Sequence, residues 1–483
     1  MDLFKQTNRG DLMGEIFHKI NFGIEVAFGV WTTIMVYCTV LMIIGLLPCR
    51  KFKKTDKLNT FAVLVSARNE EQTIGQLVDS VKKQDYPADK ITCFVIAHNC
   101  TDKTAEIARN AGAIVYEFND PRAKEHPRKY ARKGHAYKYF FEKIKADYPN
   151  GIETFDATVM FDADNVLARD CIARLNDGMV ECPQFDMFVA YQMSKNFDNN
   201  ANTSYSSMYQ YSDMIRNKRP LTLLGVSCFG AGCGACFRSN VLRDNWDCLT
   251  LTEDTEFCLK LISRGYRSIC VESARFWDER ALSLDITVRQ RMRWANGQFY
   301  MYFRRLPRLI FGVFFPYDRR LKRNDAPKIG ILKRTYGEIM KRASCLHSIF
   351  LFMPWWVYSF IITNLYPIYV LVFKQDTYTM FNHVIIFVSM TWSIDTMEHI
   401  LVLIRERKWI QGKMHFEDFM FHVMSWPLFA IYMQYVNFVA VIYPVKWKPI
   451  PHVIPKTVDI CEKEKSILPI EDIFKRQKTP PAK

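Results

Sequence analysis

Long apolar runs at the two ends of the chain flank a middle region in which short apolar runs alternate with amphipathic ones. The first long run covers residues 24–47, and the others lie near Ile349–Phe373, Met380–Ile404 and Phe416–Tyr443. Each run has the roughly 20 residues that an α-helix needs to cross a hydrocarbon core about 30 Å thick. The pattern therefore predicts transmembrane helices on both sides of a domain that folds in water.

The middle region has the pattern of an α/β domain. Amphipathic stretches typical of helices cover Glu70–Lys83 and Thr101–Asn110. The apolar runs typical of buried strands are Phe61–Ala67, Thr92–Ala97, Ala113–Phe118 and Thr158–Phe161. Strands separated by helices of this length predict a Rossmann-like, mainly parallel sheet with helices on both faces. Ligands of such sheets bind at the carboxyl ends of the strands, so we expect the chemistry there.

The charge distribution and the cysteine content indicate the cellular compartment of the middle domain. The 483 residues carry a formal charge of +15, and a basic cluster, residues 50–57, directly follows the first apolar run. Cationic flanks belong on the cytoplasmic side, which favours a cytoplasmic middle domain in a multi-pass protein of the plasma membrane, with lipids rather than nucleic acid as partners. Fourteen cysteines without a repeating spacing indicate a reducing environment.

Charged motifs stand where the predicted strands end. Glu70 and Glu71 follow the first strand, Asp102 follows the second, and Asp162 and Asp164 end the fourth. Two carboxylates one residue apart supply oxygen ligands for a hard divalent cation that also binds phosphates. A capping or loop role is the alternative for such an Asp-x-Asp pair.

Two more motifs lie further along the chain. Thr252-Glu253-Asp254 opens a predicted helix that ends near Gly265, and Gln290-Arg291-Met292-Arg293-Trp294 lies in a basic amphipathic stretch, Asp285 to Arg305. Alone, the first is explained as a helix N-cap. The second is explained as a helix on a membrane surface, with Arg304, Arg305 and Arg308 toward lipid headgroups.

Taken in order, the motifs resemble those of the processive family 2 glycosyltransferases, which include cellulose, chitin, hyaluronan and poly-N-acetylglucosamine synthases. Lys133-Gly134 and the glycine-rich stretch Gly230 to Arg238 are similar to two further elements of that family. The resemblance implies a GT-A fold and a nucleotide-diphosphate sugar donor, usually UDP-linked. It also implies inverting transfer to a hydroxyl acceptor, with Mg²⁺ or Mn²⁺ as cofactor.

The resemblance gives each motif a role. Asp254 would be the general base, and Asp162 and Asp164 would hold the metal against the diphosphate. The donor would be bound by Ala67, Glu70, Asp102, Lys133 and Asp162. The diphosphate and the acceptor would be bound by Glu253, Gln290, Arg293 and Trp294. One position departs from the family, because His98 stands where an Asp often contacts the nucleobase.

Two functions remain open on this basis. The first is a polysaccharide synthase; the alternative is a single-transfer glycosyltransferase with a membrane lipid as acceptor. A catalytically silent scaffold is a third, against which the intact acidic motifs argue. The expected organisation is an N-terminal segment (1–23), a transmembrane helix (24–47), a GT-A domain (57–305), a juxtamembrane linker (306–348), C-terminal membrane helices (349–443) and a cytoplasmic tail (444–483).

The last apolar run poses a topological conflict. Three full spans after a cytoplasmic domain would place the tail outside, yet Lys446 and Lys448 follow the run directly. Pro427 is expected to split Phe416–Tyr443 into pieces too short to span. We therefore predict an interfacial or re-entrant element there, with the tail inside.

Overall fold

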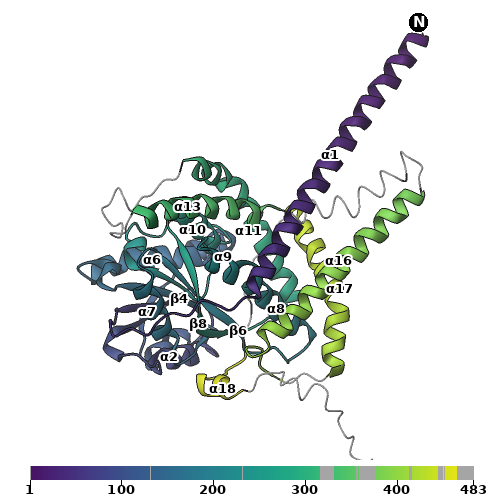
Figure 1. The fold of residues 1–483 in the computed structure, drawn as a ribbon. Coiled ribbons are helices and arrows are strands. Elements are labelled where there is room, and N and C mark those ends of the chain that lie inside the picture. The colour runs from purple at the N-terminus through teal and green to yellow at the C-terminus, as the bar shows by residue number, and fades with distance from the viewer. Residues whose placement is uncertain are drawn as a thin grey trace, which may run out of the picture.

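The computed structural model describes residues 2–130, 132–230, 232–315, 331–354, 377–412, 416–443 and 452–464, together with 357, 371 and 450. At its centre lies an eight-stranded mixed sheet in the order β3-β2-β1-β4-β7-β6-β8-β5 (Figure 1). The strands are β1 (Phe61–Ala67), β2 (Ile91–His98), β3 (Ile114–Phe118), β4 (Ala157–Asp162), β5 (Val166–Leu167), β6 (Met187–Ser194), β7 (Ala235–Arg238) and β8 (Ser268–Asp278).

The sheet confirms the mainly parallel α/β prediction. Strands β3, β2, β1 and β4 run parallel, and β6 is parallel to β8. Strand β7 enters antiparallel between β4 and β6, and β5 is antiparallel to β8. The register pairs Ser66 of β1 with both Ile96 and Asp162, so the carboxyl ends of the neighbouring strands share one edge.

Alternation along β1 divides the interior into two cores. Phe61, Val63 and Val65 pack on the side of α2 (Ile74–Lys82), α3 (Thr104–Asn110) and α7 (Cys171–Glu181). Ala62 and Leu64 pack on the other side, with α6 (Lys133–Asp147) and α10 (Glu253–Ile262). Because both faces are covered, each buried Val or Phe contributes about 1.5–3 kcal/mol of transfer free energy. The result is a helix–sheet–helix sandwich that holds the strand ends rigidly.

The described part of the chain also contains long helices. They are α1 (Asp2–Gly45), α11 (Leu284–Phe314), α13 (Ile331–Phe352), α16 (Thr377–Glu406) and α17 (Phe416–Ile442). Figure 1 shows α1 projecting away from the sheet, with α16 and α17 on the same side of the molecule. The remaining helices are α4 (Arg122–Glu125), α5 (Pro127–Tyr130), α8 (Ala201–Asp213), α9 (Arg219–Leu224) and α18 (Val458–Lys463).

These helices meet the prediction of four transmembrane segments only in part. Within the described residues, one helix, Glu417–Ile442, is long and apolar enough to cross a bilayer, while Gly29–Gly45 is apolar but shorter. The predicted span Ile349–Phe373 lies mostly outside the described residues. The expected linker 306–348 is helical where it is described, in α11 and α13. A multi-pass layout therefore stays a proposal.

The prediction that Pro427 splits the last apolar run is wrong. Helix α17 continues through Pro427 over 27 residues. Proline removes one backbone hydrogen bond, and a helix tolerates this loss where neighbours cover the freed carbonyl. Helix α17 has such neighbours, since it packs against α11 and α16. The split at Pro427 is therefore no longer a reason to expect a re-entrant element at this position.

A buried arginine joins the long helices to the sheet. The Arg219 side chain on α9 is 1% exposed, and its guanidinium donates to Glu272 on β8 at 2.6 and 2.8 Å. It also donates to Glu406 at the end of α16 at 2.7 Å and to the carbonyl of Gly45 at the end of α1 at 2.8 Å. One cation thus neutralises two buried carboxylates and connects the ends of α1 and α16 to strand β8.

Replacement of this arginine by Met tests its importance. We expect Arg219→Met to destabilise the fold by about 3–5 kcal/mol, because it leaves two buried carboxylates without a counter-charge. Thermal unfolding of the purified protein in detergent measures the effect. The control is Arg109→Met, since the Arg109–Glu117 pair is about half exposed and such pairs contribute at most about 1 kcal/mol. Equal unfolding midpoints for both variants would contradict the prediction.

Candidate active site

The first acidic residue of the Asp-x-Asp pair meets a lysine. Asp162 ends β4, and its carboxylate forms an ion pair with Nζ of Lys133, the first residue of α6. A tight turn orients the aspartate, because its backbone N–H donates to Asn165 Oδ1 at 3.0 Å. Burial opposes ionisation, but Lys133, helped by His452 and Arg293, holds the pKa of Asp162 below its usual value. Asp162 is thus an anion at neutral pH.

The second residue of the pair lies deeper. The Asp164 side chain is 4% exposed and accepts hydrogen bonds from the backbone N–H of Glu279 at 3.2 Å and from Asn165 Nδ2 at 3.3 Å. Asp278, at the end of β8, accepts from the same Asn165 amide at 2.7 Å. Burial, together with Asp164, raises the pKa of Asp278 to about 7. The ends of β4 and β8 therefore form one dense group of carboxylates.

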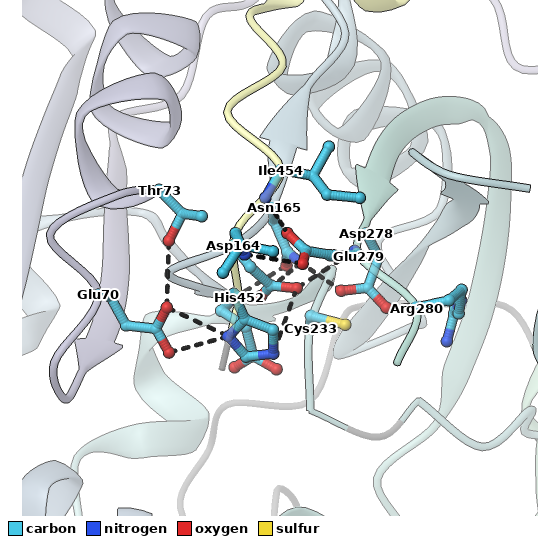
Figure 2. A network of polar contacts seen from close by, with 12 residues as sticks. Glu70, Thr73, Asp164, Asn165, Cys233, Asp278, Glu279, Arg280, His452 and Ile454 are labelled. Carbon is cyan, nitrogen blue, oxygen red and sulfur yellow. Dashed lines mark hydrogen bonds and ion pairs between the residues drawn. The ribbon is translucent and has the colours of Figure 1, made fainter. Parts of the chain in front are cut away.

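A histidine from the C-terminal part of the chain lies in this group (Figure 2). His452 Nδ1 lies 2.9 and 3.1 Å from the two carboxylate oxygens of Glu70, and its Nε2 lies 4.0 Å from Asp164 Oδ2. Burial opposes protonation, but Asp164 and Glu70 raise the pKa of His452 to about 10. The imidazole is therefore a cation at neutral pH and lies between two of the predicted site carboxylates.

The segment that carries His452 is anchored along its length. The Glu279 carboxylate accepts from the backbone N–H groups of Val453 and Ile454 at 2.9 and 3.0 Å. Further along, Asp459 on α18 forms ion pairs with Lys83 and Arg169. These contacts fix residues 452–464 against the sheet domain.

The predicted acceptor-side motifs approach the Asp-x-Asp pair from the helices. Glu253 and Asp254 form the first turn of α10, and α11 packs directly on Thr252, because a Cβ at Gly297 would lie 2.5 Å from Thr252 Cγ2. Burial and the neighbouring Asp254 raise the pKa of Glu253 to about 7. The Arg293 charge acts against the rise at Glu253 and also favours ionised Asp162. The positive charge of Arg293 thus acts on a carboxyl group in each of these two motifs.

The glycine-rich stretch faces the predicted base. Gly232 has a φ of +68°, and a Cβ at that position would lie 3.1 Å from Asp254 Oδ2. Glycine is therefore favoured at this position both by backbone conformation and by space. Asp254 Oδ1 accepts the backbone N–H of Thr255 at 2.6 Å, which leaves Oδ2 toward the loop. Asp254 Oδ2 therefore lies beside the glycine-rich stretch.

The Gln-x-x-Arg-Trp motif lies on α11 with half-buried side chains at Gln290, Arg293 and Trp294. The unassigned Arg291 between them is buried, with its guanidinium 3.6 Å from the ring centroid of Tyr209 and 5.2 Å from that of Trp294. Such stacking holds the indole in place.

The expectation that Arg305 meets lipid headgroups is wrong. Arg305 is buried and donates to Glu256 Oε1 at 2.8 Å. Glu256 lies on α10 and is itself buried, so it needs a counter-charge from the facing helix. Arg304 also pairs with Glu256, at 3.4 Å, but stays half exposed.

Two residues predicted to bind the nucleotide-sugar donor lie at the same sheet edge but outside the cluster of carboxylates at the ends of β4 and β8. Ala67 is buried at the end of β1. The Asp102 carboxylate accepts from Thr104 N and Oγ1 at 3.1 and 2.6 Å and from Glu71 N at 3.2 Å. These bonds organise the turn before α3, so the structure gives Asp102 a capping contact. Its role in nucleotide binding stays a prediction.

The side chains that could ligate a metal suit an ion that is also bound by phosphate groups of a substrate. Among the described residues, no group of three or more His, Cys, Asp and Glu side chains converges as a complete cation site. Mg²⁺ typically takes one or two protein carboxylates and completes its shell with substrate phosphates and water. Asp162 and Asp164 offer that number, and both carry cationic partners, Lys133 and His452. The pair therefore fits a divalent ion held jointly with a diphosphate.

Sequence reasoning missed the residues of β8 and of the C-terminal segment. Asp278 and Glu279 directly follow Phe276 and Trp277, but Glu272 and Arg275 interrupt the apolar pattern before them, so the strand-end signal that identified Asp162 is weak at this position. His452 lies between prolines in a segment without periodicity, and its contacts with Glu70 and Asp164 arise only from the tertiary fold.

Comparison with known proteins supplies the family. Residues 59–297 match the model of the family described as "Glycosyltransferase like family 2". The match begins just before β1 and ends on α11, and it includes every acidic motif named above.

Residues 59–297 form a glycosyltransferase family 2 domain. This result confirms the predicted family and, with it, the class of enzyme.

Curated relatives of this glycosyltransferase domain are distant. The chain is 23% identical over 273 residues to the probable glycosyltransferase YdaM of Bacillus subtilis, which covers 54% of the chain and 62% of YdaM. It is 23% identical over 251 residues to the poly-beta-1,6-N-acetyl-D-glucosamine synthase of Staphylococcus epidermidis, covering 50% of the chain and 55% of that enzyme. A 4,4'-diaponeurosporenoate glycosyltransferase of Staphylococcus aureus is 34% identical over 126 residues, covering 25% of the chain and 30% of that protein. The chain thus spans less than two thirds of each of these relatives.

Solved structures similar to the chain include two glycosyltransferases with bound donors. The mannosyltransferase PcManGT from Pyrobaculum calidifontis, in complex with GDP-Man and Mn²⁺, is 14% identical with a TM-score of 0.47, covering 87% of this chain and 97% of that one. S. aureus TarS in complex with UDP-GlcNAc is 13% identical with a TM-score of 0.37, covering 78% and 90%.

Metal dependence tests the carboxylate pair. We expect Asp162→Ala or Asp164→Ala to weaken Mn²⁺ binding in the presence of UDP by tenfold or more, since even outer-shell changes cost about 10–100-fold. Titration followed by electron paramagnetic resonance measures free Mn²⁺.

Asp170→Asn is the matched control, because Asp170 lies outside the cluster of carboxylates at the ends of β4 and β8 and forms an ion pair with Arg174. Binding of Mn²⁺ that is the same in all three variants and in the unaltered chain would show that the metal site lies elsewhere.

Proposed function

We propose that the chain is a membrane-embedded inverting glycosyltransferase that transfers a sugar from a nucleotide-diphosphate donor, UDP-linked, to a growing polysaccharide. The observation that carries the proposal is that Arg293, in the Gln-x-x-Arg-Trp motif, acts on residues of two other motifs. Its charge acts on Asp162 at the end of β4 and on Glu253 at the start of α10. A donor diphosphate and an acceptor hydroxyl can therefore meet in one site.

Three cations suit the leaving group. Lys133 contacts Asp162, His452 contacts Glu70 near Asp164, and Arg293 reaches the same region from α11. As the bond from the anomeric carbon to the phosphate oxygen breaks, negative charge grows on the diphosphate, and fixed cations stabilise it. A divalent ion bound by Asp162 and Asp164 would add counter-charge to the diphosphate.

Asp254 takes the proton in this proposal. The acceptor hydroxyl oxygen forms the new bond to the anomeric carbon, and its proton passes to the Asp254 carboxylate. Glu253, buried and with a pKa near 7, is positioned beside it to orient the acceptor. Trp294, held by Arg291, offers an indole face on which a sugar can stack.

Membrane attachment supports a product or acceptor that stays near the bilayer. The apolar helices α1, α16 and α17 lie on one side of the sheet domain (Figure 1). We place the enzyme in the plasma membrane with lipids as partners and the catalytic domain in the cytoplasm. This placement rests on the apolar runs and on their basic flanks.

A single transfer to a membrane lipid is the second candidate. Helix α11 ends in exposed aromatic residues, with Phe311, Phe314 and Phe315 each more than half exposed. Such side chains suit a membrane interface or an apolar acceptor. The likeness to the 4,4'-diaponeurosporenoate glycosyltransferase, which is named for 4,4'-diaponeurosporenoate and not for a polysaccharide, also favours it.

Product size separates the two candidates. Purified protein in lipid bilayers is incubated with radiolabelled UDP-sugars and Mg²⁺, and the product is sized by gel filtration and by extraction into organic solvent. We expect a high-molecular-weight polymer in the aqueous phase. A labelled product of one sugar per lipid in the organic phase would establish the second candidate.

Substitution of the base gives a sharper kinetic test. We expect Asp254→Asn to lower kcat by about 10²-fold or more, because the amide keeps the shape of the side chain but cannot accept the proton. Binding of UDP should stay within about twofold. The comparison is Lys133→Met, which removes a cation beside Asp162 and should weaken UDP binding instead. Loss of UDP binding in Asp254→Asn would assign this residue to the donor rather than to the proton.

A further inference from the structure

A cavity of about 290 Å³ lies between strand β8 and the segment that follows α16. Its wall includes Arg275 and Trp277 of β8, Lys408 and Trp409 after the end of α16, and Glu462 of α18. None of the residues predicted to bind donor, acceptor or metal lines it. Its volume lies just below the roughly 300–1,000 Å³ of typical small-molecule sites. The cavity therefore suits a small ligand or a headgroup.

Two cations in the cavity wall are held by an aromatic ring. The Arg275 guanidinium lies 4.8 Å and Lys408 Nζ 4.4 Å from the ring centroid of Trp409. An indole attracts a cation through its quadrupole but has no net charge, so it leaves the positive charge available to a ligand. Arg275 also approaches Asp170, at 3.6 Å, but this carboxylate has a closer partner in Arg174, at 3.1 Å.

The acidic residue in the wall is already neutralised. Glu462 accepts from the backbone N–H of Arg169 at 2.9 Å and forms an ion pair with the Arg169 guanidinium at 3.3 Å. A free carboxylate at this position would compete with an incoming anion for Arg275 and Lys408. Because Arg169 engages Glu462, the cavity keeps a positive character.

Two buried donors at the cavity lack an acceptor. In the described part of the chain, Trp409 Nε1 and Lys195 Nζ are buried and have no hydrogen-bond partner. The charge of Lys195 acts on the Cys461 thiol, one residue before Glu462, so this ammonium lies on the α18 side of the cavity. Buried donors without an acceptor are costly, and the oxygens of an anion would satisfy them.

The cavity adjoins the ends of two apolar helices. Lys408 follows the end of α16 by two residues, and Arg405 in the last turn of α16 donates to the carbonyls of Leu46 and Leu47, directly after α1. In the proposed topology these are the cytoplasmic ends of the helices, where anionic lipid headgroups attract basic residues. A lipid phosphate is therefore available beside the cavity.

We propose that this cavity is a phosphate-binding site separate from the active site. Arg275 and Lys408 pair with the charge of the phosphate, and Trp409 Nε1 donates to one of its oxygens. Lipid headgroups and soluble phosphate esters share this chemistry. The place of the cavity beside α1 and α16 favours the lipid.

Calorimetric titration of the purified full-length chain in neutral detergent tests the proposal. The probes are inorganic phosphate, glycerol 3-phosphate and the water-soluble lipid dihexanoyl phosphatidic acid. We expect all three to bind, and the lipid to bind at least about tenfold more tightly than glycerol 3-phosphate, because its acyl chains add apolar burial. Equal affinity for these two probes would support the phosphate site and assign it to a soluble ester.

Substitutions at the wall locate the bound phosphate. Lys408→Met should weaken binding of glycerol 3-phosphate about tenfold or more, since a hydrogen bond between charged groups is worth that factor. Trp409→Phe keeps the ring but removes the N–H, and should weaken binding by a smaller factor. The matched control is Arg407→Met, which removes the same charge from an exposed neighbour that does not line the cavity. Its affinity should stay unchanged.

Three outcomes would overturn the proposal. The first is that none of the three probes binds to the unaltered chain. The second is equal affinity in Lys408→Met, in Arg407→Met and in the unaltered chain. The third is binding that Lys133→Met abolishes and Lys408→Met retains, because the phosphate would then lie beside Asp162 in the active site. Binding of UDP, measured in the same variants, tests the proposed function separately.

Discussion

The guanidinium of Arg219 is the interaction on which the arrangement of the molecule depends. Gly45, Glu272 and Glu406 lie far apart in sequence, on α1, β8 and α16, and one buried side chain contacts all three. Two carboxylates buried side by side repel each other and lose their hydration, so neither element could bring its acid to this position alone. The cation makes the apolar helices and the catalytic sheet parts of one body.

The active site follows from the same elements. Strand β8 passes from Glu272 to Asp278 and the following Glu279, and these two support Asn165, Asp164 and the backbone of the His452 segment. The site is rich in carboxylates. Shared burial raises the pKa values of Glu253 and Asp278, whereas the Lys133 cation lowers that of Asp162. Such a group attracts cations strongly, which matches a substrate that brings a metal and several phosphate charges with it.

The sequence was most informative where local pattern and chemistry agree. Strands β1 to β4 lie within one or two residues of the predicted runs. For β1 and β4 the reason is burial, because a strand covered on both faces must be apolar throughout, while β3 lies partly exposed at the sheet edge. Asp162, predicted from the strand-end pattern, and Lys133, predicted only through the resemblance, lie in direct contact. Donor, acceptor and metal roles remain proposals, since contacts in the free chain do not test them.

The features that the sequence pattern did not predict depend on tertiary contacts. Arg305 belonged to an amphipathic pattern that fits a membrane surface and a protein surface equally well, and a buried Glu256 resolved the choice. Pro427 removes a backbone hydrogen bond from α17, and the packing of this helix against α11 and α16 compensates for the loss. Strand β7, only four residues long, and His452, in an aperiodic segment, take their places from partners that are distant in sequence.

The anchored segment 452–464 means that the family 2 domain is not a self-sufficient unit. The matched region ends at residue 297, yet a histidine about 150 positions later supplies positive charge to its acidic centre. A protein trimmed to the conserved domain would keep every recognised motif and still have Glu70, Asp164 and Glu279 facing solvent on that side. A search that recognises such enzymes by this domain alone would treat the trimmed protein as complete, although residues 452–464 contribute contacts to its acidic centre.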